Sequence, residues 1–277
     1  MASICLSIKN IMRPQVLVSE KDFLVVYKPP RMHSAPLTRS PSDNLLNWCA
    51  GKFPEIADLP GRRTGEGGLL HRLDFETHGL LLIARNLRGM EVFIDQQKAG
   101  IIIKEYCALT SEAITTLPGF PKENPGIPPD LIHDKEPVKN SMPVSIKSAF
   151  RSYGFGRKAV RPVIAEDENG TSANKKDIVF DNGKPYVTDI LETHSLSHGI
   201  TFFRLRIFRG FRHQIRSHLA WLNRPVLNDD IYGNAMNRDA SFGKSLLGLR
   251  AYSISFIDPS SKIKRAYSVP SLELDEI

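Results

Sequence analysis

The chain has 277 residues, enough for one large domain or two smaller ones with a substantial buried core. Its composition, 41% hydrophobic and 24% charged, is that of a globular protein, and no apolar run is long enough to span a membrane. Lysine and arginine number 37 against 30 acidic residues. The resulting net charge of +7 is compatible with a polyanionic partner, although composition alone favours a merely basic soluble enzyme.

Cysteine usage and the N-terminus bear on the cellular compartment. The first residues form too short and interrupted an apolar stretch for a signal peptide. Cys5, Cys49 and Cys107 are odd in number, widely spaced and outside any CxxC pair, which favours reduced thiols over a disulfide framework or a zinc site. We therefore expect a cytoplasmic protein that binds no membrane.

The first half of the chain predicts four elements. Residues 22–27 form a short apolar run that stops at Lys28 and two prolines, so a strand should end there because proline cannot donate to a ladder. Residues 80–84 have the length and apolar continuity of a buried strand. Residues 87–99 show helical spacing and end at a glycine, and residues 101–109 open another strand.

Prolines and polar residues dominate the segment from about 111 to 185, which predicts a loop-rich insertion. Within it, residues 150–158 (FRSYGFGRK) interleave aromatic and basic residues around two glycines. Such a mixture can contact phosphates and stack on bases, but a solvated surface turn is the commoner explanation of such a run.

The last third predicts two strands and a helix. Residues 201–207 alternate apolar side chains with arginines, which is typical of a half-buried strand. Residues 213–223 place apolar side chains on one helical face, and residues 246–256 predict a final core strand. Because strands are interspersed irregularly with few helices, we expect an α+β fold with a mixed, mostly antiparallel sheet flanked by helices and loops.

Four separated segments together resemble the RluA family of pseudouridine synthases: VVYKPPRMHS, LLHRLDFETHGLLLIAR, KEYCALT and GFRHQIRSHLAWLNRPVLNDDIYG. The resemblance covers roughly residues 16–110 and 184–258 and implies the catalytic fold of these enzymes. We expect a single catalytic domain over residues 1–277 with the insertion at 111–185. Since the first matching strand begins near Val16, we expect no separate S4 RNA-binding domain.

The resemblance also implies a function. The family converts uridine in structured RNA to pseudouridine without a cofactor, and its motif residues correspond here to Asp74, Tyr106 and Arg216 as the catalytic set. The aspartate would act as a nucleophile or as a proton acceptor and charge stabiliser near C1′ of a flipped-out nucleotide. The expected partner is ribosomal or transfer RNA, bound by a monomer.

Eight further residues are expected to bind the substrate. Lys28, Arg72, Arg157 and Lys158 are candidates for phosphate contacts. The others lie in the matching motifs and are Thr77, His213, Gln214 and Leu249. His71, His213 and His218 form no HxxxH pair and have no cysteine partner, so we expect no metal.

Several positions depart from the common form of the family motifs. His78 stands where serine is usual, Phe211 and Arg212 replace an arginine and a threonine, and Asn223 and Asn228 replace two glycines. Asparagine tolerates the left-handed backbone that such turns require better than other non-glycine residues do. In the last strand, Arg250 stands where histidine is usual. Because these changes flank the expected substrate surface, they bear on the choice of RNA.

Two other functions fit parts of the sequence. A catalytically silent RNA-binding protein would keep the fold as a clamp, yet a clamp has no need of an acid such as Asp74 facing phosphates. A hydrolase using Asp74 with His71 or His213 would lack a nucleophile motif such as G-x-S-x-G.

Overall fold

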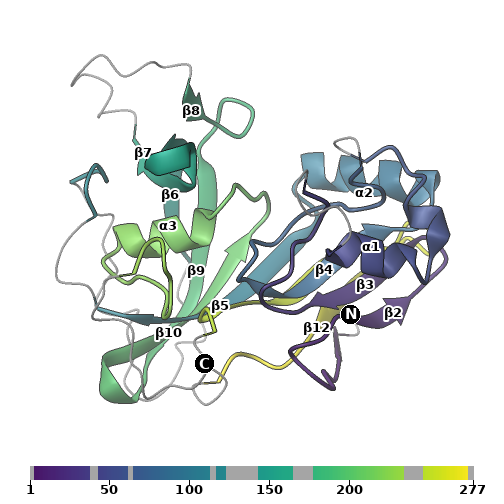
Figure 1. The fold of residues 1–277 in the computed structure, drawn as a ribbon, viewed down its shortest axis with the longest axis horizontal. Coiled ribbons are helices and arrows are strands. Elements are labelled where there is room, and N and C mark those ends of the chain that lie inside the picture. The colour runs from purple at the N-terminus through teal and green to yellow at the C-terminus, as the bar shows by residue number, and fades with distance from the viewer. Residues whose placement is uncertain are drawn as a thin grey trace. The chain divides into compact units, whose positions relative to one another are not determined.

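A computed structural model describes residues 3–37, 43–61, 65–112, 117–122, 143–164, 177–233 and 246–273. The chain divides into two compact units (Figure 1): Met1–Tyr106 with Arg250–Ser271, and Cys107–Leu249 with Leu272–Ile277. The first boundary falls within strand β5 (Ile103–Ser111) and the second at the start of strand β11 (Leu249–Ile257). The expected single domain stays a prediction.

The sheet of the first unit follows the order β2–β3–β4–β11. Its strands are β2 (Gln15–Ser19), β3 (Phe23–Lys28), β4 (His78–Ala84) and β11, with β12 (Lys264–Ser268) beside β11 and β1 (Ser3–Cys5) beside β12. The β4–β11 and β1–β12 pairs are parallel and the others antiparallel. All residues of β3 and β4 are buried, which confirms the strands predicted from their apolar runs.

Two α-helices belong to this unit, and each begins at an asparagine cap. Helix α1 (Leu45–Ala50) starts after Asn44, and a 3-10 turn (Pro54–Ile56) follows it. Helix α2 (Leu87–Lys98) starts after Asn86, whose side chain accepts a hydrogen bond from the Gly89 amide at 2.8 Å. The helix predicted over residues 87–99 is thereby confirmed.

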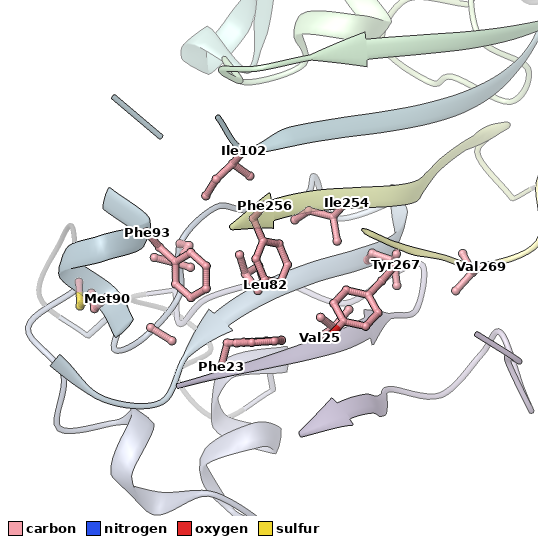
Figure 2. Packing of buried hydrophobic residues seen from close by; sticks show 13 residues of the cluster. Phe23, Val25, Leu82, Met90, Phe93, Ile102, Ile254, Phe256, Tyr267 and Val269 are labelled. Atoms are coloured by element: carbon pink, nitrogen blue, oxygen red, sulfur yellow. The ribbon is translucent and has the colours of Figure 1, made fainter. Parts of the chain in front are cut away.

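An aromatic cluster forms the core of the first unit (Figure 2). Phe23 of β3, Phe93 of α2 and Phe256 of β11 meet edge to face, with ring centroids 5.0–6.0 Å apart. Burial of each such ring stabilises the fold by about 1.5–3 kcal/mol. The cluster therefore holds β3, β4, α2 and β11 together, and β4 becomes a rigid support for the loop that precedes it.

The second unit contains an antiparallel sheet in the order β10–β9–β6–β7. Its strands are β10 (Ile200–Ile207), β9 (Tyr186–Ser195), β6 (Val144–Tyr153) and β7 (Ala159–Val163), and the short β8 (Ile178–Val179) also pairs with β6. Two 3-10 turns lie at Phe155–Arg157 and Ser197–Gly199. Phe203 and Leu205 of β10 are completely buried between partly exposed arginines, as the alternation predicted.

The predicted helix near residues 213–223 is present as α3 (Gln214–Trp221), and the apolar side chains Ile215 and Leu219 of its predicted face are buried. All eight residues are buried, because its polar side chains find partners inside the unit. The ring of His218, for example, lies 2.9 Å from both Ser148 Oγ and Thr188 Oγ1.

Two predictions about the fold need correction. The loop-rich description of residues 111–185 fails over 144–163, where β6 and β7 lie: the prolines that suggested it precede Val144, and Ile146 and Phe150 are buried. The polar stretch 166–176 lies outside the described residues. Strand β11 is also not the last, because β12 follows and buries Tyr267. Throughout the described ranges, no helix has the length and apolar character needed to cross a membrane.

Candidate active site

Asp74 lies on the loop that leads into β4 and is half-buried. The loop is held immediately before it: the Ser34 hydroxyl donates to the Leu73 carbonyl at 2.9 Å and accepts from the Leu73 amide at 3.0 Å. Further back, His71 Nε2 accepts a hydrogen bond from the Leu82 amide at 3.2 Å. The loop segment that precedes Asp74 is thus fixed by hydrogen bonds to Ser34 and to Leu82 of β4.

Lys28 holds the other side of the same loop. Its Nζ donates to the carbonyl oxygens of Pro29 at 2.9 Å, Met32 at 2.7 Å and Phe75 at 3.1 Å, and the side chain is completely buried. An ammonium group has three donors, so these bonds leave none for a phosphate. The expected phosphate contact of Lys28 is therefore wrong for this structure, because the side chain points into the protein.

The ionisation of Lys28 reflects this position. Burial lowers the pKa of Lys28 to about 7, while the nearby charges of Asp74 and Glu76 act in the opposite direction. The loss of hydration therefore affects the pKa of Lys28 more than the two neighbouring carboxylates do.

Tyr106 of β5 also lies in the electrostatic field of Asp74. Burial, and to a smaller extent the charge of Asp74, raise the pKa of the Tyr106 hydroxyl well above its ordinary value. Tyr106 thus keeps its proton at neutral pH and can donate it. The first unit brings Lys28, Asp74 and Tyr106 together.

The loop ends in buried polar residues at the start of β4. Thr77 Oγ1 and both ring nitrogens of His78 have no hydrogen-bond partner in the described part of the chain. Burial, then the charges of Arg250 and Lys28, lower the pKa of His78 well below its ordinary value, so the ring is neutral. The next residue must be glycine: at Gly79, φ is +124° and a Cβ would lie 2.1 Å from the Ala251 carbonyl oxygen.

A second group of polar residues lies in the second unit around Arg216. Its Nε and Nη2 donate to Asp229 Oδ2 and Oδ1, each at 2.7 Å, and the two side chains are 4% and 0% exposed. Asp229 Oδ1 also accepts from the amides of Ile231 and Tyr232. A bidentate carboxylate held by its own turn fixes the guanidinium in place.

Tyr232 completes this second group. Its hydroxyl accepts from the Val160 amide at 2.8 Å and lies 3.2 Å from His213 Nδ1, and its ring centroid is 5.5 Å from the Arg216 guanidinium. Burial raises the pKa of Tyr232 above its ordinary value. Sequence reasoning missed both Asp229 and Tyr232, although they lie in the quoted segment NDDIYG. Arg216 belongs to a different unit from Asp74 and Tyr106, so the expected catalytic set of these three residues stays a prediction.

The remaining expected substrate contacts differ in accessibility. Arg72, Arg157 and Lys158 are exposed and stay candidates for phosphate contacts. Gln214 is buried and donates to the Val187 carbonyl at 2.9 Å and Thr188 Oγ1 at 3.0 Å, so it supports the fold instead. Thr77 and Leu249 are buried and His213 half-buried.

Two asparagine positions confirm a sequence prediction. Asn223 and Asn228 have φ values of +56° and +59°, the left-handed backbone expected where they replace glycine. Among the described residues, no three or more His, Cys, Asp or Glu side chains form a group that could hold a metal ion.

Two solved human structures share this fold. RNA pseudouridylate synthase domain containing 4 gives a TM-score of 0.58 at 16% identity, covering 94% of this chain and 90% of that one. RNA pseudouridylate synthase domain containing 1 gives 0.57 at 21%, covering 92% and 83%. The class of fold is therefore the α+β fold of these enzymes, as predicted.

Curated proteins with a similar sequence are also named as pseudouridine synthases. An uncharacterized RNA pseudouridine synthase of Helicobacter pylori is 25% identical over 94% of this chain and 67% of its own length. The ribosomal large subunit pseudouridine synthase D of Yersinia pestis is 28% identical over 79% of this chain and 52% of its own. The chain thus spans about half the length of the latter relative.

The family model for RNA pseudouridylate synthase matches residues 22–221. The chain belongs to this family, as a pseudouridine synthase of the RluA type, and its enzyme class is that of an isomerase acting on RNA. The resemblance drawn from the four motifs is confirmed.

Proposed function

We propose that this protein isomerises uridine to pseudouridine in structured RNA, with Asp74 as the catalytic residue. The observation that carries the proposal is the setting of Asp74: a half-buried carboxylate on a loop fastened by Ser34 and Lys28, in electrostatic contact with the buried Tyr106. The reaction breaks the bond from C1′ to N1 and forms one from C1′ to C5. Because nothing is oxidised, reduced or hydrolysed, no cofactor is required.

The chemistry requires the target nucleotide to leave its base stack, since C1′ and the uracil edge are inaccessible inside a helix. Asp74 then acts at C1′, by attack or by stabilising the positive charge that develops there. Tyr106 is the proposed stacking face for uracil, and its hydroxyl is proposed to take part in the proton transfer that removes the hydrogen from C5 and adds one to N1.

Arginines supply the positive charge of the proposed catalytic site and RNA-binding surface. Arg216, held in place by Asp229, belongs to the proposed catalytic set, as the family resemblance implies. Exposed Arg72 and Arg157 contact phosphates and orient the RNA. Lys28 is given a different role, that of positioning the Asp74 loop through the Phe75 carbonyl.

Ribosomal RNA is the proposed substrate class. Several relatives are named as ribosomal large subunit synthases. The net charge of +7 also supports a polyanionic substrate. We propose that the protein acts as a monomer in the cytoplasm.

The test replaces Asp74 by asparagine and uses Glu76→Gln as its matched control. Both changes remove one negative charge from the same loop while keeping the shape of the side chain, and Glu76 faces Arg31 at 3.8 Å rather than the proposed chemistry. Pseudouridine would be mapped in ribosomal RNA from cells lacking the gene, after incubation with each purified protein. Asp74→Asn should form none, whereas Glu76→Gln should act like the wild type.

RNA affinity, measured on the same variants, separates chemistry from docking. Asp74→Asn should bind within a few fold of the wild type, because the carboxylate acts on the chemical step. Equal loss of binding and turnover would make Asp74 a structural residue. A wild-type protein that binds RNA but adds no pseudouridine would favour the catalytically silent RNA-binding protein.

A further inference from the structure

The turn between β6 and β7 exposes a phenylalanine completely. Phe155 is 98% exposed, although nearly all other aromatic side chains described in the chain are at least partly buried. Gly154 and Gly156 on either side have φ values of +77° and +65°, a left-handed backbone that glycine adopts without strain. The turn therefore holds the ring away from the protein, where it is hydrated at a free-energy cost.

The hairpin that carries this ring is rich in basic side chains. Arg157 and Lys158 follow it directly and are exposed, and Arg157 pairs with Asp177 at 3.0 Å. Lower in the hairpin, Arg151 and Arg161 are directly opposite in the β6–β7 ladder. Like charges opposite one another destabilise a sheet, and a bound anion relieves the repulsion. The charge pattern is therefore complementary to phosphate.

The loop before α3 fastens the hairpin. Arg212 Nη2 donates to the Arg157 carbonyl at 2.8 Å and to Ser152 Oγ at 3.1 Å. Phe211 stacks on buried Phe150 of β6, with ring centroids 5.1 Å apart and planes 8° from parallel. These two residues, which we call the Phe211–Arg212 clasp, stand where the common motif has arginine and threonine.

Helix α3 anchors the returning strand. Ser217 Oγ donates to the Val160 carbonyl at 3.0 Å, and the Val160 amide donates to Tyr232. The hairpin is thus connected to the element that carries Arg216. A turn held this way is organised before binding, so little conformational entropy is lost when its tip meets a partner.

We propose that Phe155 stacks on an unpaired RNA base while the basic side chains of the β6–β7 hairpin contact the flanking phosphates. The inference rests on the proposed function, because that function makes RNA the partner. An aromatic ring combined with positive charge is the combination that single-stranded nucleic acid binds, whereas a protein partner has no regular array of anions for three arginines and a lysine. Phe211 and Arg212, which depart from the common motif, would then have the role of positioning Phe155.

The test compares Phe155→Ala with Phe180→Ala, an exposed phenylalanine of the same unit that stands next to Asp181 instead of basic residues. The probe is fluorescein-labelled oligouridine of about 12 nucleotides, titrated by anisotropy at several salt concentrations. Phe155→Ala should raise Kd by about 5- to 150-fold. Phe180→Ala should leave Kd unchanged.

The salt dependence distinguishes stacking from charge. Phe155→Ala should leave the slope of log K against log salt unchanged, because no counterion is released by a phenyl ring. Replacing Arg157 and Lys158 by alanine should flatten it by about 0.7 for each phosphate that the variant no longer neutralises. Phe155→Trp supplies an independent readout, since stacking on a base quenches its emission. Unchanged Kd in Phe155→Ala together with unquenched emission in Phe155→Trp would overturn the proposal.

A double-mutant cycle tests the clasp. The variant F211R/R212T restores the common motif and removes both interactions with the hairpin. If the clasp positions Phe155, adding Phe155→Ala to this variant should weaken binding much less than in the wild type. Full additivity would remove the clasp from the proposal.

Pseudouridine formation separates this inference from the proposed function. If the wild type forms pseudouridine and Phe155→Ala matches it in kcat, KM and oligouridine affinity, the inference alone fails. If the wild type forms none but Phe155→Ala loses oligouridine affinity, the proposed function fails and stacking at the hairpin stands.

Discussion

Replacing Lys28 by methionine tests how the fold handles a buried ammonium group. Methionine keeps most of the side chain's length but removes the three hydrogen bonds to carbonyl oxygens. Burial lowers the pKa of Lys28 from 10.5 to about 7. Between these two values the unfolded chain binds a proton at Lys28 that the folded protein does not, so the wild-type free energy of unfolding rises with pH.

The size of the effect follows from the same values. One proton of difference changes the free energy of unfolding by about 1.4 kcal/mol per pH unit. Since the folded protein is still partly protonated near pH 7, the wild type should gain about 2 kcal/mol relative to Lys28→Met between pH 7 and pH 9. Below about pH 6 both states carry the proton, and the difference should become constant.

Urea denaturation of both proteins at several pH values measures this difference directly, because all other titrating groups cancel in the comparison. Lys98→Met is the matched control: Lys98 is largely exposed beside Asp95 and should give a difference that does not vary with pH. A wild-type advantage that stays constant from pH 7 to pH 9 would refute the reasoning. It would mean that Lys28 remains charged and that its carbonyl bonds outweigh burial.

Three other variants test the surrounding structure. Tyr106→Phe should lower the rate of isomerisation without changing the alkaline limb of the pH–rate profile up to about pH 10, because burial keeps the Tyr106 hydroxyl protonated. If the variant lost an ionisation in that limb, the hydroxyl would not be the protonated group that we describe. Asp229→Asn should lower the free energy of unfolding by about 3–5 kcal/mol, since it breaks a buried ion pair. Its control, Glu112→Gln, removes one partner of an exposed pair and should change that free energy by about 1 kcal/mol or less. Urea denaturation measures both. Burial lowers the pKa of His218 from 6.5 to about 3, so the wild-type free energy of unfolding should fall as pH drops from 6.5 towards 3. The free energy of unfolding of His218→Gln should fall less over that range, as measured by acid titrations followed by circular dichroism.

The sequence alone predicted the features that depend on neighbouring residues. Continuous apolar runs predicted β3 and β4, helical spacing predicted α2, and alternation predicted β10. The spacing of HRLD, KEY and HQIR predicted the family and pointed to Asp74. These signals lie within short stretches, because backbone geometry sets the side-chain periods of helices and strands.

Only the tertiary structure decided which polar side chains are buried. Lys28, next to two prolines, was expected on the surface, yet carbonyl groups from two separate segments surround its ammonium group. The apolar spacing predicted for helix α3 did not indicate that Arg216 is buried, where it finds its carboxylate in Asp229 on a turn beyond the helix. A polar group can be buried only when other parts of the chain supply its hydrogen-bond partners, and no local pattern specifies where those partners will lie.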